Sequence, residues 1–268
     1  MATLKIMSLR SLPAAQYREL SCAQCRAGEG LDFNFSFAFQ PIVNATKRQI
    51  IAYEALVRGP NGESAFSILD KVSDENRYAF DQACRVKAIA LASSLNINCR
   101  LNLNFFPNAI YKPELCIRTT LEAAKKYGFP IENITFEFLE GEKAQDNSHL
   151  RRIVESYKKF GFKTALDDFG SGYSGLCLLA DFQPDIIKID RLLLQNVDQN
   201  FCRQIIIEGI IATATRLGIK VVAEGVETRE EYRWLLNAGI VEFQGYYFCR
   251  PAFEQLPLVD AQSFETGV

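Results

Sequence analysis

Short apolar runs alternate with longer amphipathic stretches from about residue 36 to residue 250 of the chain. Eight runs have the length and the β-branched or aromatic content of strands: 36–43, 50–57, 99–104, 134–138, 163–167, 186–189, 220–224 and 241–244. Strands that alternate with helices are typical of βα units around a parallel sheet. Eight strands within 268 residues therefore predict an α/β fold, a closed TIM-like (β/α)8 barrel.

Three of the stretches between these runs carry helix signals. Two of them place apolar side chains at helical spacing: Phe80, Cys84, Ala88, Leu91 and Leu95 in the first, and Leu150, Ile153, Val154, Tyr157 and Phe160 in the second. In the third, a capping box from Thr228 to Glu231 predicts the start of a helix that Gly239 ends.

The remaining segments set the expected domain bounds. Residues 1–30 are predicted to form an irregular N-terminal extension, residues 31–258 the barrel, and residues 259–268 a C-terminal tail. No stretch approaches the roughly 18 apolar residues of a membrane span. Because the start also lacks the long apolar core of a signal peptide, we expect neither export nor a membrane partner.

Composition narrows the classes of partner and compartment. The net charge is −2 and the sequence pI is about 5.7, so no overall positive field favours DNA. The eight cysteines are scattered rather than grouped into a disulfide framework, which favours a reduced, cytoplasmic protein. Cys22 and Cys25 form a single CxxC pair, which supplies too few ligands for a tetrahedral zinc site.

Polar side chains stand at the end of almost every predicted strand. They are Glu54, Asn104, Glu137, Asp167, Asp168, Lys188, Glu224 and Gln244. A (β/α)8 barrel gathers its functional residues at the C-terminal ends of its strands, so these side chains should converge. Carboxylates this close need protons or cations, and oxygen donors without a His or Cys cluster favour Mg²⁺ or Mn²⁺. The adjacent Asp167 and Asp168 suggest a bridge between two metal ions about 3.5 to 4 Å apart.

Each of these residues has an ordinary alternative explanation when taken alone. A single strand-end glutamate is more often solvated or salt-bridged than a metal ligand. Lys188 could pair with Asp190, Gln244 could be a core amide, and Arg58 could be a surface charge. Eight such residues at the ends of the predicted strands favour a shared site over eight independent coincidences.

Six motifs together resemble the EAL-domain family, whose members are phosphodiesterases specific for cyclic di-GMP. They are "FQPIV" at 39–43, "YEALVRG" at 53–59, "DDFGSGYSGL" at 167–176, "IKID" at 187–190, "VVAEGVET" at 221–228 and "FQGYYF" at 243–248. The resemblance covers about residues 36 to 252. It implies a barrel with an antiparallel first strand, a homodimer, and hydrolysis of cyclic di-GMP to linear pGpG with two Mg²⁺ or Mn²⁺ ions.

The resemblance also implies roles for individual residues. The first metal would be held by Glu54, Asn104, Glu137 and Asp167, and the second by Asp167, Asp168 and Glu224, with Gln244 completing the site. Lys188 would lie beside the attacking water, and the catalytic set would be Glu54, Asp167, Asp168, Lys188 and Glu224. Substrate contacts would come from Gln40, Leu56, Arg58, Asn104, Asp168, Lys188, Glu227 and Gln244, while Glu140 would steady the loop after Asp168.

Some assignments within the motifs need a choice. Both Asn102 and Asn104 point the same way on a strand, and Asn104 is preferred because its distance to Ile110 fits the family. Phe106 and Leu139 depart from the residues usual at their positions, which puts substrate contacts and loop setting in doubt. Ca²⁺ forms longer bonds than Mg²⁺, so we expect it to bind and inhibit.

Two function classes stay open, with a third behind them. The chain is expected to be a cyclic di-GMP phosphodiesterase, or else a receptor or protein-interaction regulator that binds the nucleotide without turnover. Receptors of this kind typically lose the EAL glutamate, a metal aspartate or the lysine, and all are present here. An unrelated two-metal hydrolase would leave Gln40 and Arg58 unexplained. Residues 50–70 and 104–121 resemble the branch found behind blue-light sensors, which suggests a separate sensor or regulatory protein as a partner.

Overall fold

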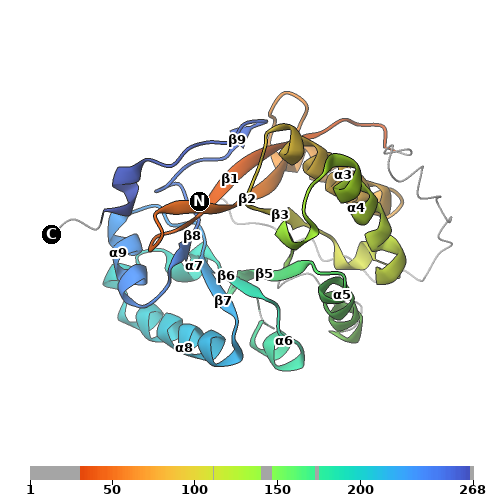
Figure 1. Ribbon diagram of the computed structural model, residues 1–268. Coiled ribbons are helices and arrows are strands. Elements are labelled where there is room, and N and C mark those ends of the chain that lie inside the picture. Colours follow the sequence, from red (N-terminus) through yellow and green to blue (C-terminus); the bar gives the residue numbers. More distant parts are fainter. Residues whose placement is uncertain (1–30, 111, 140–146, 173–174, 266–268) are drawn as a thin grey trace.

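The strands of the computed structural model close into a barrel (Figure 1). The structure describes residues 31–110, 112–139, 147–172 and 175–265. The sheet runs in the order β2-β3-β4-β5-β6-β7-β8-β1-β9, and β1 also pairs with β2, which completes the circle. Neighbours from β2 to β8 are parallel, whereas β1 is antiparallel to both β2 and β8. The predicted TIM-like barrel with an antiparallel first strand is confirmed.

The elements follow one another as strand and helix along most of the chain. The strands are β1 (Ser36–Asn44), β2 (Gln49–Arg58), β3 (Arg100–Asn104), β4 (Ile134–Leu139), β5 (Lys163–Phe169), β6 (Ile186–Ile189), β7 (Lys220–Ala223), β8 (Glu242–Phe243) and β9 (Ala252–Phe253). The helices are α2 (Ala65–Leu69), α3 (Arg77–Ser94), α4 (Pro113–Tyr127), α5 (Asn147–Lys159), α6 (Gly175–Asp181), α7 (Arg191–Leu194), α8 (Phe201–Leu217) and α9 (Arg229–Asn237). Short 3₁₀ turns lie at Pro107–Ala109, Ile131–Asn133, Val197–Gln199 and Ala261–Phe264.

The antiparallel start of the barrel follows from a short turn between β1 and β2. Only residues 45–48 connect the two strands, too few for the crossover that a parallel pair requires. The Asn44 side chain accepts a hydrogen bond from the Lys47 amide (2.9 Å), and Arg48 takes the left-handed conformation with φ 51°. This hairpin sets Gln40 directly opposite Glu54.

The inner side of the barrel has an apolar level below a polar one. Ala52, Ala165, Ile186 and Val222 form a buried cluster with Ile42. Each of these four residues lies two positions before a residue of the predicted site: Glu54, Asp167, Lys188 and Glu224. Because side chains on a strand alternate between its two sides, residues two apart share a side. The site therefore stands on a packed apolar floor.

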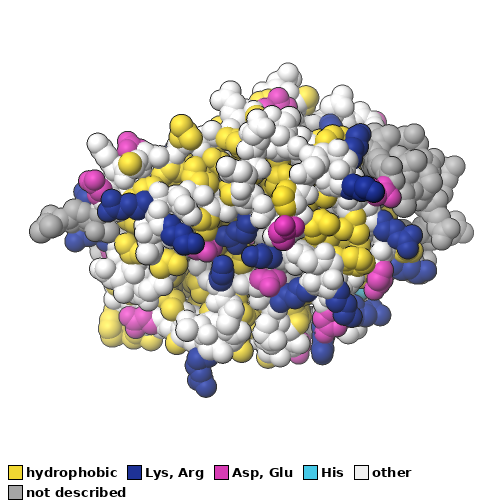
Figure 2. All heavy atoms as spheres, in the orientation of Figure 1, with side chains coloured by type: hydrophobic (Ala, Val, Ile, Leu, Met, Phe, Trp, Pro, Cys, Tyr) yellow, Lys and Arg dark blue, Asp and Glu magenta, His cyan; other side chains and the backbone are white. Residues whose placement is uncertain are grey.

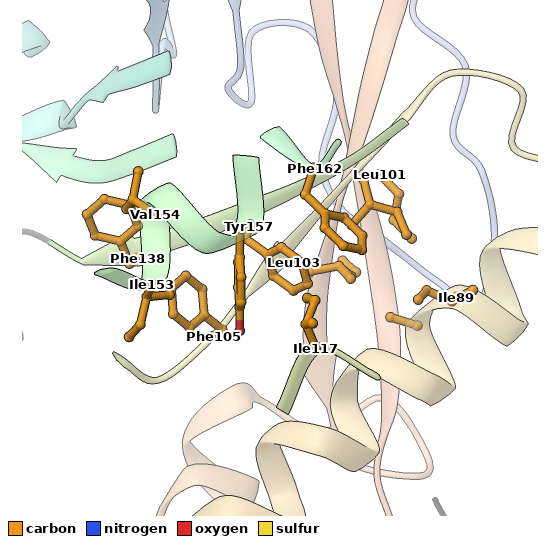
Figure 3. Close-up of a cluster of buried hydrophobic side chains, with 14 of the residues drawn as sticks. Ile89, Leu101, Leu103, Phe105, Ile117, Phe138, Ile153, Val154, Tyr157 and Phe162 are labelled. Carbon is orange, nitrogen blue, oxygen red and sulfur yellow. The ribbon is translucent and has the colours of Figure 1, made fainter. Parts of the chain in front are cut away.

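Two larger clusters bury the outer side of the barrel against its helices. One lies between β1–β5 and α3, α4 and α5, and Figure 3 shows part of it. It includes Phe35, Phe37 and Phe39, which are core residues as expected. The other lies between β7, β8, α8 and α9, where the predicted capping box at Thr228 and Glu231 is present.

The buried side of α3 includes more than the predicted apolar stripe. Phe80 and Ala88 are buried, but Cys84, Leu91 and Leu95 are only half-buried. All five predicted residues lie in the core or pack against it, so the stripe is confirmed. The helix also buries Asp81, Gln82, Arg85, Ile89 and Ala92, and a count of apolar positions missed the buried ion pair between Asp81 and Arg85. On α5 the stripe is confirmed except for Phe160, which is exposed.

Some expectations fall outside the described residues. These are the N-terminal extension with Cys22 and Cys25, and Glu140. Among the described residues, no helix combines the length and the apolarity needed to span a bilayer. On the face seen in Figure 2, basic and acidic side chains are interspersed.

Candidate active site

The barrel brings the predicted strand-end residues to one edge. Parallel strands end on the same side of a sheet, and the alternation that buries the apolar floor turns the next inward residue toward the barrel mouth. Glu54 comes from β2, Asn104 from β3, Glu137 from β4, Asp167 and Asp168 from β5, Lys188 from β6, and Glu224 and Gln244 from the residues that follow β7 and β8.

Lys188 is the centre of this arrangement. Its Nζ lies 3.0 Å from Asp167 Oδ1 and 3.1 Å from a carboxylate oxygen of each of three glutamates, namely Glu54, Glu137 and Glu224. The Lys188 side chain is fully buried. The alternative partner, Asp190, instead caps α7 by accepting a hydrogen bond from the Leu192 amide (2.7 Å).

Three amide side chains donate hydrogen bonds to the carboxylates. Asn104 Nδ2 donates to Glu54 Oε1 (2.9 Å), and Gln244 Nε2 donates to Glu54 Oε2 (2.7 Å) and Gln40 Oε1 (3.2 Å). Asn102, which the sequence left as the second choice, also reaches the cluster, where its Nδ2 donates to the deeper Glu137 Oε1 (2.6 Å). The period of two along β3 is the signal that could have placed both asparagines in the site.

The adjacent aspartates reach the same site because β5 is irregular there. Consecutive residues of a regular strand point to opposite sides of a sheet. The register with β6 shifts between Leu166 and Phe169, and Asp168 takes the left-handed conformation with φ 53°. This bulge lets the carboxylates of Asp167 and Asp168 gather with that of Glu224.

Burial and mutual repulsion shift the pKa values in the cluster. Burial raises the pKa of Glu137 and of Glu224 well above the usual value, and Asp167 raises both further. Burial, followed by Asp167 and Asp190, raises the pKa of Asp168 to about 7. Burial alone would lower the pKa of Lys188, but the surrounding carboxylates outweigh it and hold that pKa well above its usual value. The lysine thus stays charged, and not every carboxylate can be ionised beside it at neutral pH.

The arrangement of oxygens fits two divalent cations. Two groups of carboxylates, Glu54–Glu137–Asp167 and Asp167–Asp168–Glu224, each place oxygens within 4.8 Å of one another and share Asp167. Asp167 Oδ1 and Glu224 Oε2 are buried and accept no well-oriented hydrogen bond, although each lies within about 3.1 Å of Lys188 Nζ. A site whose ligand atoms are all oxygens, some of which accept no hydrogen bond, suits hard cations such as Mg²⁺ and Mn²⁺.

Of the expected substrate residues, Asn104, Asp168, Lys188 and Gln244 belong to the cluster, whereas Leu56, Arg58 and Glu227 do not. Leu56 and Arg58 follow Glu54 at intervals of two on β2 and are half-buried, and Arg58 Nη1 donates to the Val57 carbonyl (2.7 Å). Glu227 forms an ion pair with Arg191 Nη2 at 2.8 Å. Arg191 also contacts the Gly225 carbonyl and Glu231, so it ties α7 to the loop after β7, a link that the sequence motifs did not indicate.

Known proteins are similar to this chain in sequence. BluF of Escherichia coli K12, a blue light- and temperature-regulated antirepressor, is 34% identical over 227 residues, which are 84% of this chain and 56% of BluF. The probable cyclic di-GMP phosphodiesterase PdeD of the same strain is 27% identical over 246 residues, which are 87% of this chain and 44% of PdeD. The chain thus spans about half the length of these curated relatives.

Solved structures agree with the closed barrel. A standalone EAL protein of Vibrio cholerae O395, in its c-di-GMP-bound form, is 56% identical with a TM-score of 0.86, covering 88% of this chain and all of that one. The calcium/cy-diGMP complex of Klebsiella pneumoniae BlrP1 is 35% identical with a TM-score of 0.80, covering 84% of this chain and 57% of BlrP1. The EAL domain model matches residues 28–251, which are most of the sequence. The chain therefore belongs to the EAL-domain family.

Proposed function

We propose that this protein is a phosphodiesterase that hydrolyses cyclic di-GMP to linear pGpG with Mg²⁺ or Mn²⁺. The observation that carries the proposal is a cluster of carboxylates that forms two metal-sized groups sharing Asp167. Glu54, Glu137 and Asp167 are buried beside Lys188, and Asp168 and Glu224 are half-buried. The similar structures from Vibrio cholerae and Klebsiella pneumoniae are described as c-di-GMP-bound, the latter also as a manganese complex. A barrel that had lost hydrolysis would not need to keep this costly group of charges.

The donor set divides between the two proposed metal positions. Glu54, Asn104, Glu137 and Asp167 would hold one ion, and Asp167, Asp168 and Glu224 the other, with Gln244 orienting Glu54 through its hydrogen bond. When bound, such ions would polarise a water molecule and neutralise phosphate charge.

Lys188 has a separate part in the proposed reaction. Four carboxylates fix its Nζ at the centre of the site and keep it protonated. A positioned ammonium can orient the attacking water through its N–H groups and stabilise the negative charge that grows on the phosphate. Because the ammonium is buried, this stabilisation needs little reorganisation.

Substrate recognition is proposed for residues at the rim of the mouth. The Arg58 guanidinium can exchange its contact with the Val57 carbonyl for a two-pronged phosphate contact. Gln40, which is hydrogen-bonded to Gln244 and opposite Glu54, and Leu56 and Glu227 complete the proposed contacts.

The alternative is a regulator that binds the nucleotide or a protein without turnover. One observation favours it: a similar protein, BluF, is described as an antirepressor. A separate sensor or regulatory protein is the proposed partner, because residues 50–70 and 104–121 resemble the branch of the family found behind blue-light sensors.

Incubation with cyclic di-GMP and Mg²⁺ or Mn²⁺, followed by chromatography of the products, separates the two. Appearance of pGpG supports the enzyme, whereas nucleotide that binds and stays intact with either metal supports the regulator. Ca²⁺ provides a further arm, because its longer bonds of about 2.3 to 2.6 Å do not match the octahedral spacing that Mg²⁺ requires. Excess Ca²⁺ should stop product formation, and undiminished turnover would contradict a strict two-metal site.

We also propose that a second copy of this chain packs against α6, α7 and α8. These helices expose large apolar side chains: Leu176 on α6, Leu192 on α7, and Phe201, Ile205 and Ile206 on α8. Exposed patches of large apolar side chains commonly mark an interface, and α8 fully buries only Ile207 and Ala214. Analytical ultracentrifugation should show a dimer that Phe201→Glu weakens. Leu258→Glu, which also replaces an exposed leucine, is the matched control.

A further inference from the structure

A buried ion pair lies outside the barrel wall and takes no part in the acidic cluster. Asp81 and Arg85 stand one turn apart on α3, with Arg85 Nε 2.9 Å from Asp81 Oδ2, and their side chains are 1% and 0% exposed. Arg85 is among the largest fully buried side chains of the described residues. Such a pair gives little net stability, since well-packed apolar residues of similar size are often as stable or more so. Its presence calls for a reason other than stability.

The arginine half of the pair joins three elements. Arg85 Nη1 donates to the Tyr157 hydroxyl of α5 (2.9 Å). The guanidinium also lies over the Phe136 ring of β4 at 4.8 Å and the Phe105 ring, just after β3, at 5.6 Å. Figure 3 shows Tyr157 next to Phe105 in the middle of this cluster. Arg85 therefore fixes where Asp81 stands relative to the ends of β3 and β4.

The aspartate half holds the backbone that leaves β3. Asp81 Oδ1 accepts a hydrogen bond from the Phe106 amide at 3.0 Å. The amide of the preceding residue, Phe105, donates to the carbonyl of Glu137 at 3.0 Å. Asn104, whose side chain donates to Glu54, comes directly before these two fixed amides. The chain thus passes from the acidic cluster to Asp81 within three residues.

We infer that Asp81 is a positioning residue of the proposed hydrolysis, which holds the Phe106 backbone so that Asn104 and Glu137 face the site. Without this acceptor the Phe106 amide would need another partner, and the turn after Asn104 would shift to find one. The effect on the site is indirect, since Asp81 touches neither the carboxylates around Lys188 nor the amides that bind them. The catalytic meaning of this inference rests on the proposed function, whereas the geometric part does not.

Two double variants isolate the hydrogen bond from the ion pair. Asp81→Asn with Arg85→Met removes both charges but keeps an oxygen that can accept from the Phe106 amide. Asp81→Leu with Arg85→Met has the same shape and no acceptor. Both lose the Arg85 contact with Tyr157, and both lose the second carboxylate oxygen of Asp81, which accepts from Gln82 Nε2 at 3.1 Å. Their difference therefore reports the bond to Phe106. Ile89→Ala, at a fully buried position of the same helix, controls for a general loss of stability.

Three readouts follow the consequences. Exchange of the Phe106 amide with deuterium should be slow in the wild type and in the asparagine variant, and faster in the leucine variant. The side-chain amide signals of Asn104 should move only in the leucine variant. Mn²⁺ affinity, measured by electron paramagnetic resonance, and kcat should fall by about 10- to 100-fold in that variant, the usual effect of losing a group that orients a metal ligand, while the asparagine variant recovers most of both.

Equal Mn²⁺ affinity and equal Asn104 signals in the two double variants would overturn the inference. So would a Phe106 amide that exchanges in the wild type as fast as an unprotected one, a result that needs no variant to fold. If the wild type neither binds Mn²⁺ nor hydrolyses cyclic di-GMP, the proposed function fails. The Phe106 exchange and the Asn104 signals then still decide whether Asp81 sets the geometry of the loop.

Discussion

The inside of the barrel has two levels of side chains on the same strands, one apolar and one charged. The lower level consists of Ala52, Ala165, Ile186 and Val222, which are buried and apolar and contribute to stability. Two residues further along the chain stand Glu54, Asp167 and Lys188, which are buried, and Glu224, which follows β7 and is half-buried. Desolvation raises the pKa of Glu224, and burying such charges costs folding free energy. The comparison teaches that the residues that stabilise the barrel and the residues proposed to carry the reaction lie only two positions apart along the chain.

The largest expected effect comes from removing a carboxylate of the upper level. Glu54→Ala and Asp167→Asn should each abolish hydrolysis of cyclic di-GMP, because each takes away a proposed metal ligand. The free energy of unfolding should stay the same or rise in Asp167→Asn, because Asp167 repels Glu137, Asp168 and Glu224. It should fall in Glu54→Ala, because Lys188, Asn104 and Gln244 each lose an acceptor. Product chromatography and urea unfolding check both parts. Activity within a few-fold of wild type in either variant would refute the ligand assignment.

A substitution in the apolar level should have the opposite effect, a loss of stability without a loss of activity. Ile186→Ala leaves a cavity in the apolar floor and should lower the free energy of unfolding by about 2 to 5 kcal/mol. Hydrolysis per folded molecule should stay within a few-fold of wild type, because Lys188 keeps its four partners. A large loss of turnover with little loss of stability would show that the two levels are not separable.

The pH dependence of stability provides a finer test. The pKa of Asp168 rises from 3.8 to about 7 on folding, so the folded state binds more protons than the unfolded state between these values. Its contribution to stability is therefore lost as pH rises from about 4 to 7. In the presence of a chelator, the wild type should become less stable over this range than Asp168→Asn does. Thermal unfolding from pH 4.5 to 8 measures the difference between the two, and parallel curves would contradict the prediction.

The smallest expected effect lies at the rim. Arg58→Lys keeps a positive charge but loses the planar fork that can hold two phosphate oxygens. We expect KM for cyclic di-GMP to rise roughly tenfold with metal affinity unchanged. Arg216→Lys, at an exposed position on α8, is the control. Unchanged kinetics would mean that Arg58 does not contact the substrate.

The sequence was informative wherever a pattern repeats along a strand. Spacing alone predicted the eight strands and placed Glu54, Glu137 and Glu224 near one edge, because parallel strands leave no other arrangement. The buried polar face of α3 was not predictable in this way, since Asp81 and Arg85 look like surface residues to a count of apolar positions. Their burial depends on Tyr157 and Phe106, which are distant in the sequence and meet α3 only in the folded chain.

The contacts between loops could not be predicted from the sequence for a similar reason. Arg191 lies next to the "IKID" motif, yet its partners Gly225 and Glu227 belong to another loop. Asn102 and Asn104 both reach the cluster, where each donates to a different carboxylate, and Asn104 stays the proposed metal ligand. Motifs identify which residues gather, whereas the partner of each residue depends on depth along the barrel.

The bulge at Asp168 has a consequence for anyone who would build this site on another barrel. On a regular strand, inward-facing residues repeat about every 6.6 Å, since each residue advances about 3.3 Å. Two metal ions that share a water lie only about 3.5 to 4 Å apart, so a regular strand offers them carboxylates too far apart. Consecutive Cα atoms are about 3.8 Å apart, and a residue that is turned inward by its positive φ supplies donors at that finer pitch. Grafting the two aspartates onto an ideal strand would therefore carry over the side chains and lose the spacing.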